Sequence, residues 1–120
     1  MDRFLLDAVY RHAEGRERPR AIAGPPGIFE RVSEITGDHR DQPSRADRRF
    51  AWFERDGGAR FERAGAHVET VRMEHSGPDN GYRVHVDGGV VAYTGDTAPG
   101  DHIHELAQGA DVLIVECDGP

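Results

Sequence analysis

The stretch YRVHVDGGVVAYTGDT, residues 82–97, contains two short apolar segments joined by a glycine turn. Residues 82–86 and 90–93 have the composition of strands, and Asp87-Gly88-Gly89 between them is a strong hairpin signal. The second segment stops at Thr94-Gly95-Asp96-Thr97, where the glycine permits a sharp change of chain direction. The stretch therefore predicts a β-hairpin whose exit carries a carboxylate at a glycine corner.

Around this hairpin the chain alternates between helical and extended patterns. Apolar spacing and glycine or proline stops predict helices over residues 2–14, 28–35 and 99–108, and further strands over residues 20–23, 50–53, 59–62, 66–74 and 111–116. Because residues 111–116 are almost continuously apolar, we expect that strand to be central and covered on both faces. The charged segment 39–49 is expected to be an exposed loop. The order predicts one domain of the α/β (layered α+β) class over residues 1–120, with helices packed on a mixed sheet.

Composition narrows the class of protein. The 120 residues carry a formal net charge of -7, which does not favour broad non-specific binding to nucleic acid. Cys117 is the single cysteine, so no internal disulfide is possible, and we expect a cytoplasmic location. No apolar run approaches the roughly 20 residues that a membrane-spanning helix needs, so we expect no membrane partner.

Two residues at predicted strand ends are the candidates for chemistry. Asp96 follows the hairpin and His75 follows the strand at 66–74, and α/β proteins often place reactive groups in such loops. A histidine there can act as a metal ligand or a general base. The alternative is structural: Asp96 would cap a turn or the next helix, with Thr97 helping, and His75 would be a solvated loop residue. Local pattern alone favours the structural alternative for Asp96.

The remaining histidines give no metal-binding spacing. His102 and His104 are two positions apart on a predicted helix, so their side chains point in nearly opposite directions and cannot chelate one ion. We expect both on the helix surface. The other histidines are expected to be ordinary surface residues; they are His12, His39, His67 and His85.

Four stretches occur together in an order that resembles a known family. They are IAGPPG at 22–27, MEH with GYRV at 73–75 and 81–84, AYTGDT at 92–97, and GADVLIVE at 109–116. Together they resemble the metallo-β-lactamase superfamily, and within it the ribonuclease Z-like branch. The resemblance implies part of an αββα sandwich and a metal-dependent hydrolase that uses metal-activated water.

The resemblance also implies a site. Asp96 would bridge two Zn²⁺ ions, or Mn²⁺, as a catalytic ligand, His75 would be a ligand to one ion, and Thr97 would support them from just outside the ligands. The implied substrate is a small phosphodiester or one derived from nucleic acid. Residues 76–94 leave no room for the long transfer-RNA-gripping arm of ribonuclease Z proper, which favours a more general phosphodiesterase.

The sequence departs from the family in its ligands. The family's His-x-His-x-Asp-His run is absent, as is a later histidine ligand, so only His75 and Asp96 can be assigned. We therefore expect an incomplete domain, an internal piece of a longer protein that has little or no activity alone. The expected partner is a second copy of this chain, in a homodimer, or a complementing N-terminal segment. The alternatives are a small non-catalytic α/β interaction module or a fragment that needs a partner chain.

Overall fold

The computed structural model describes residues 20–36 and 50–116. The expected helix at 2–14 and the expected loop at 39–49 lie outside these residues. The chain divides into two compact units, which are described separately; one comprises Met1–Ala23 with Gly27–Glu54, and the other Gly24–Pro26 with Arg55–Pro120. The expectation of a single domain remains a prediction.

The first unit contains a two-stranded sheet and one helix. The strands are β1 (Arg20–Gly24) and β2 (Phe50–Glu54), and the helix is α2 (Ile28–Thr36), all close to the predicted bounds. Between β1 and α2 the chain turns through Gly27, whose φ of 84° favours glycine. The backbone N–H of Gly27 also donates to Glu54 Oε1 at 3.1 Å, which links this turn to the end of β2.

Aromatic contacts and one aliphatic residue form the described core of this unit. Val32 and Phe50 are buried. The ring of Trp52 meets Phe29 edge-on at 5.6 Å and Phe50 at 5.9 Å between centroids, which are favourable aromatic geometries. Ile35 shares its predicted helix side with Val32 but is half exposed near the end of α2.

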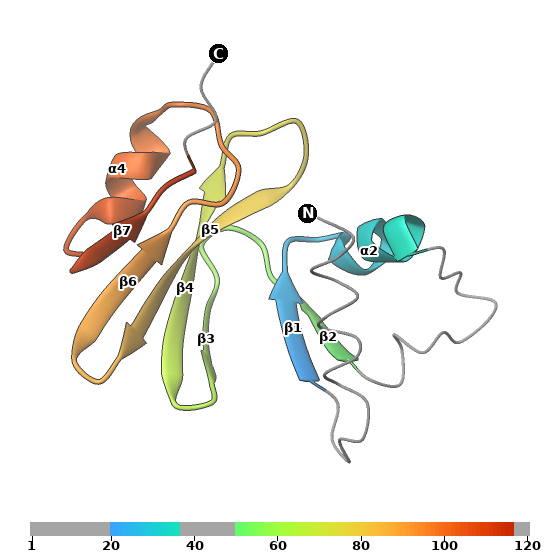
Figure 1. Cartoon of the computed structure of the whole chain (residues 1–120), viewed down its shortest axis with the longest axis horizontal. Helices are drawn as coiled ribbons and strands as arrows, with labels where there is room; N and C mark the ends of the chain where they lie inside the picture. The colour runs from blue at the N-terminus through green and yellow to red at the C-terminus, as the bar shows by residue number, and fades with distance from the viewer. Residues whose placement is uncertain (1–19, 37–49, 117–120) are drawn as a thin grey trace. The chain divides into compact units, whose positions relative to one another are not determined.

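The second unit is built on a five-stranded sheet in the order β3-β4-β5-β6-β7. Its strands are β3 (Arg60–Arg63), β4 (Ala66–Met73), β5 (Asp79–Val86), β6 (Gly89–Tyr93) and β7 (Val112–Ile114), and its helix is α4 (Asp101–Ala107). Successive strands from β3 to β6 are antiparallel, and β7 is parallel to β6 (Figure 1). The predicted hairpin of β5 and β6 and the mixed sheet are confirmed.

The start of β5 differs from the prediction. The strand begins at Asp79 rather than at Tyr82, and residues 79–81 were expected in a loop. They pair instead with β4, in the register Met73↔Asp79, Arg72↔Asn80 and Val71↔Gly81. Asn80 is buried, and its side chain donates to the Arg55 carbonyl at 2.7 Å, so tertiary contacts override the turn preference of this polar segment.

One face of the sheet packs against α4. Met73, Ala92 and Leu106 form the buried cluster between helix and sheet. Arg83 reaches from β5 to the end of the helix, where Nη1 donates to the carbonyl groups of Leu106 at 2.6 Å and Gln108 at 2.5 Å. Because the last carbonyl groups of a helix lack partners within the helix, this charged donor stabilises its C-terminus against the sheet.

The opposite face of β6 and β7 is apolar and open. Val91 pairs with Val112 and Tyr93 pairs with Ile114, and all four side chains are 40–50% exposed. The prediction that the last strand is central and covered is therefore wrong: β7 ends the order of the sheet, and Leu113 on its other face is also exposed. A continuous apolar run shows that burial of these side chains would be favourable, but the described residues leave them 39–50% exposed.

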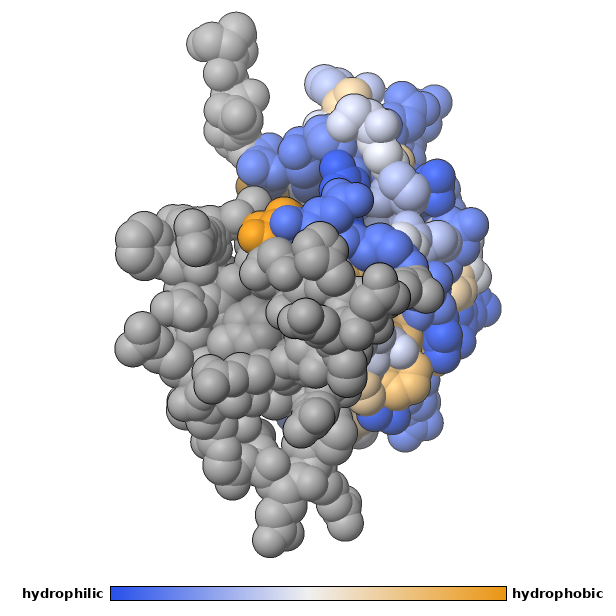
Figure 2. Space-filling model, turned by 90° about the vertical axis from the view of Figure 1, so that its right-hand side faces the viewer, coloured by the Kyte–Doolittle hydropathy of each residue, from blue (hydrophilic) through white to orange (hydrophobic). Residues whose placement is uncertain are grey.

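Much of the remaining surface is polar. On the face of the molecule that Figure 2 presents, the described residues are mostly hydrophilic, with few hydrophobic patches. Within residues 20–36 and 50–116, no helix has the length and apolar character required to cross a membrane.

The packing of α4 on β5 gives a test with a matched control. A Cβ added at Gly81 would lie 2.8 Å from Met73 Cε and 2.9 Å from Leu106 Cδ2, whereas at Gly89 the nearest atom is 3.6 Å away. We expect Gly81→Ala to lower the free energy of unfolding by about 1–3 kcal/mol through overpacking. Gly89→Ala should change it by less than about 0.5 kcal/mol. Chemical denaturation measures the free energy of unfolding of both variants. If Gly81→Ala were as stable as Gly89→Ala, the described packing of α4 on β5 would be contradicted.

Candidate functional site

Sheet topology brings two loops and the start of one strand together at the same edge of the sheet. Because β4 and β6 are each antiparallel to β5, they run in the same direction, and both finish where β5 begins. His75 lies just after β4, Asp96 just after β6, and Asp79 is the first residue of β5 between them. The register alone therefore predicts that the three side chains lie near one another.

The loops after β4 and β6 are joined by hydrogen bonds. Ala98 N–H donates to the Glu74 carbonyl at 2.8 Å, and the Thr97 hydroxyl lies 3.3 Å from the same oxygen. Gly95 makes the turn with a φ of 65°, and a Cβ at this position would lie 3.4 Å from the Asn80 carbonyl. The glycine of the Gly-Asp-Thr corner thus allows both the left-handed turn and the close approach to β5.

His75 lies between two carboxylates. Its Nδ1 is 2.9 Å from Asp79 Oδ2, and its Nε2 is 3.1 Å from Asp96 Oδ2. The side chains of His75 and Asp79 are 31% and 30% exposed, whereas that of Asp96 is 64% exposed. The structure therefore brings together the two residues that the sequence selected, and it adds Asp79, which the sequence analysis missed.

The capping alternative for Asp96 is not realised at α4. The N-cap of α4 is Gly100, and no side chain caps this helix end. Asp96 instead pairs with His75 across the edge of the sheet.

The arrangement favours a cation between His75 and Asp96. A neutral imidazole has one N–H and one lone pair, so it can donate to only one of two flanking carboxylates. With the N–H on Nδ1 facing Asp79, the lone pair of Nε2 faces a negatively charged oxygen at 3.1 Å. A proton on Nε2 or a metal ion bound by both atoms would remove this repulsion. Imidazole nitrogen and carboxylate oxygen are both ligands that zinc accepts.

The donor set is nevertheless partial. Across residues 20–36 and 50–116, no group of three or more His, Cys, Asp or Glu side chains is placed to hold a metal ion. His75 and Asp96 thus fit a metal as two of its ligands, while Asp79 fits as the group that binds the far nitrogen of the ligating histidine. Their role as ligands remains a prediction.

Thr97 and His102 connect this edge to α4. The Thr97 hydroxyl is 2.8 Å from His102 Nε2, and the same nitrogen is 3.1 Å from the Ala98 carbonyl. Thr97 thus contacts the loop beside His75 rather than either candidate ligand. His102 is partly exposed on the helix, as expected, but its ring also contacts Thr97 of the Gly-Asp-Thr corner, which the sequence did not predict. His104 is exposed, as predicted.

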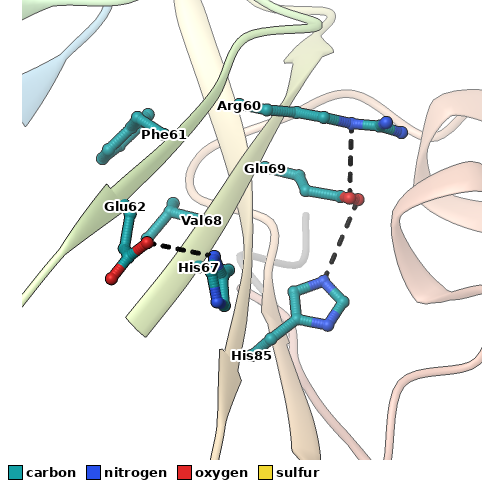
Figure 3. Close-up of a pocket in the computed structure, with 7 residues that line it drawn as sticks. All are labelled: Arg60, Phe61, Glu62, His67, Val68, Glu69 and His85. Carbon is teal, nitrogen blue, oxygen red and sulfur yellow. Dashed lines mark ion pairs between the residues drawn. The ribbon is translucent and has the colours of Figure 1, made fainter. Parts of the chain in front are cut away.

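A separate hollow lies on β3, β4 and β5 (Figure 3). Its volume is about 490 Å³, and its lining consists of Arg60, Phe61, Glu62, His67, Val68, Glu69 and His85. Charged groups in it pair with one another: Glu69 lies 3.3 Å from Arg60 and 3.9 Å from His85, and Glu62 lies 3.8 Å from His67. His75, Asp79 and Asp96 do not line this hollow, so it is not part of the candidate site.

Comparison with solved structures identifies the fold. YhfI from Bacillus subtilis, a metallo-β-lactamase fold protein, matches 95% of this chain with a TM-score of 0.71 and 15% sequence identity. The chain has the metallo-β-lactamase fold. PqqB from Methylobacterium extorquens, solved in a Zn²⁺-bound form, matches 92% of the chain with a TM-score of 0.63 and 20% identity. The metallo-β-lactamase fold that the sequence motifs implied is therefore confirmed.

Sequence comparison supports the ribonuclease Z-like branch of this fold. No family model matches the chain. Ribonuclease Z of Mycobacterium tuberculosis is 36% identical over 59 residues, which are 48% of this chain and 22% of that relative. The chain also spans only 44% of YhfI and 41% of PqqB, so it corresponds to less than half of either metallo-β-lactamase fold protein.

Tyr82, next to the site on β5, gives a pH-dependent test. Burial raises the pKa of its hydroxyl above the ordinary value of about 10, the charge of Asp79 raises it further, and a hydrogen bond with the Asn80 side chain opposes the shift. A raised pKa in the folded state means that the contribution of neutral Tyr82 to stability is complete below about pH 10 and is lost as the pH rises through the folded-state pKa.

We therefore expect the free energy of unfolding of the native sequence to fall more steeply above pH 10 than that of Tyr82→Phe. Urea denaturation at several alkaline pH values measures this difference. Tyr93→Phe, which removes the hydroxyl of a half-exposed tyrosine on the neighbouring strand, is the matched control and should retain the loss of stability at alkaline pH. The same pH dependence in Tyr82→Phe and the native sequence would contradict the burial of this hydroxyl.

Proposed function

We propose that this chain is part of a metal-dependent hydrolase of the ribonuclease Z-like branch, acting on phosphodiester bonds and located in the cytoplasm. The observation that carries the proposal is the contact of 3.1 Å between His75 Nε2 and Asp96 Oδ2. It supports the proposal because these residues come from two different loops and match two of the branch's ligand positions. The fold and the local identity to ribonuclease Z support the same reading.

Each residue has a role in the proposed site. His75 and Asp96 would hold the metal between them, and the 64% exposed side chain of Asp96 leaves its carboxylate accessible from solvent. Thr97 holds the loop that carries Asp96 through its contacts with Glu74 and His102. When bound, Zn²⁺ or Mn²⁺ would supply a water of lowered pKa as the nucleophile and would polarise the phosphoryl oxygen under attack.

The short connection between the two ligands bears on the substrate. Residues 76–94 consist of a loop and the β5–β6 hairpin, without an inserted arm. The pair of candidate ligands is also at an exposed edge of the sheet, where Asp96 is open to solvent. These features favour a small phosphodiester, or the end of a nucleic-acid strand, over a substrate gripped along its length.

Metal affinity tests the role of Asp96. The native chain should bind Zn²⁺ in isothermal titration calorimetry, and Asp96→Asn should weaken binding by at least about tenfold, because it removes the charged ligand while retaining the size of the side chain. Asp87→Asn is the matched control: it removes the same charge at the hairpin turn, where a φ of 52° suits asparagine. Equal affinities for the native chain and Asp96→Asn would overturn the assignment of Asp96.

A second candidate function rests on the exposed apolar face of β6 and β7, which includes Val91, Tyr93, Val112 and Ile114. Such a face suits a non-catalytic α/β interaction module. It also suits a homodimer or a complementing N-terminal segment that would bring further ligands. Light scattering with and without Zn²⁺ distinguishes these cases. A monomer that binds no zinc and retains a stable fold would favour the interaction module over the hydrolase.

A further inference from the structure

We infer that Asp79 is a positioning residue that fixes the orientation and tautomer of His75 for metal binding. The inference deepens the proposed function and rests on it, because His75 is a ligand only under that proposal. Asp79 itself is not placed as a ligand: its carboxylate faces Nδ1, on the side of the imidazole away from Asp96.

The backbone of Asp79 is held by the sheet. Asp79 is the first residue of β5 and pairs with Met73, a buried residue at the end of β4. The chain between them, residues 74–78, turns tightly enough that His75 and Asp79 meet four positions apart at 2.9 Å. Asp79 is fixed on a strand and contacts His75, which is carried by a loop. The more rigid Asp79 therefore sets the orientation of the His75 ring.

Asp79 is a better partner for Nδ1 than the nearby hydroxyl. Ser76 Oγ also approaches this nitrogen, but at 3.3 Å, and it can act as donor or acceptor. An ionised carboxylate only accepts, and it binds an N–H more strongly than a neutral oxygen does. The carboxylate therefore favours the tautomer that carries its hydrogen on Nδ1.

The surroundings of Asp79 also point to this role. The Asp79 side chain is only 30% exposed. Its negative charge lies close enough to Tyr82 to add to the rise that burial causes in the pKa of the tyrosine hydroxyl. A partly buried carboxylate needs a compensating donor. In the described part of the chain, His75 is the ion-pair partner that the structure gives it.

The consequence for the site is that the lone pair of His75 Nε2 is directed toward Asp96. In the neutral ring, with the hydrogen on Nδ1 held by Asp79, the lone pair of Nε2 faces Asp96. Neutral histidine must present such a nitrogen to bind a metal, and a carboxylate on the other ring nitrogen increases the basicity of the ligand. Asp79 thus prepares the ligand before a metal arrives.

Nitrogen-15 NMR of the metal-free chain reads the tautomer directly. At a pH where the His75 ring is neutral, we expect the Nδ1–H form in the native chain and in Asp79→Asn, whose amide oxygen can still accept. Asp79→Leu, similar in size but without an acceptor, should shift His75 toward the Nε2–H form and weaken Zn²⁺ binding by about 10–100-fold. Glu62→Gln, at the exposed His67 pair, should change neither measurement at His75.

The outcomes separate this inference from the proposed function. An Nε2–H tautomer at His75 in the native chain overturns the inference without requiring any variant, so a failure of Asp79→Leu to fold does not remove the test. An unchanged tautomer in a folded Asp79→Leu chain also overturns it. If the native chain shows the Nδ1–H form but binds no Zn²⁺, the positioning by Asp79 stands as a structural property while the proposed hydrolase site fails.

Discussion

The antiparallel pairing of β5 with both of its neighbours determines where every residue of the candidate site lies. It places the end of β4, the start of β5 and the end of β6 at one edge of the sheet, so that short loops suffice to bring His75, Asp79 and Asp96 together. The same pairing positions Arg83 to hold the end of α4. A one-residue shift of β5 would move Asp79 and Arg83 to the opposite face and remove both contacts.

Local sequence patterns predicted the parts of the fold that depend on local rules. The turn at Asp87 and Gly88 and the glycine corner at Gly95 have positive φ angles that few residues adopt, so the hairpin and its exit were predicted correctly. The convergence of His75 and Asp96 was predicted from motif order, because their separation in sequence gives no local signal. Its observation in the structure supports that reasoning without testing metal binding.

What the sequence did not predict depends on contacts between distant residues. Asp79 lay between the strands predicted at 66–74 and 82–86, whereas pairing with Met73 makes it part of a strand. His102 was expected on the helix surface, and helical spacing could not show that the Thr97 hydroxyl contacts its ring. The apolar run of β7 was read as central, although β7 ends the described sheet and its side chains are 39–50% exposed.

The open face of β6 and β7 affects how the protein behaves at high concentration. Val91, Tyr93, Val112 and Ile114 form a contiguous apolar stripe beside a strand edge whose backbone groups can pair with another chain. Edge-to-edge addition of such strands would give an open-ended polymer unless a symmetric contact closes it. An apolar stripe beside an open strand edge therefore makes the state of association of the described sheet depend on protein concentration.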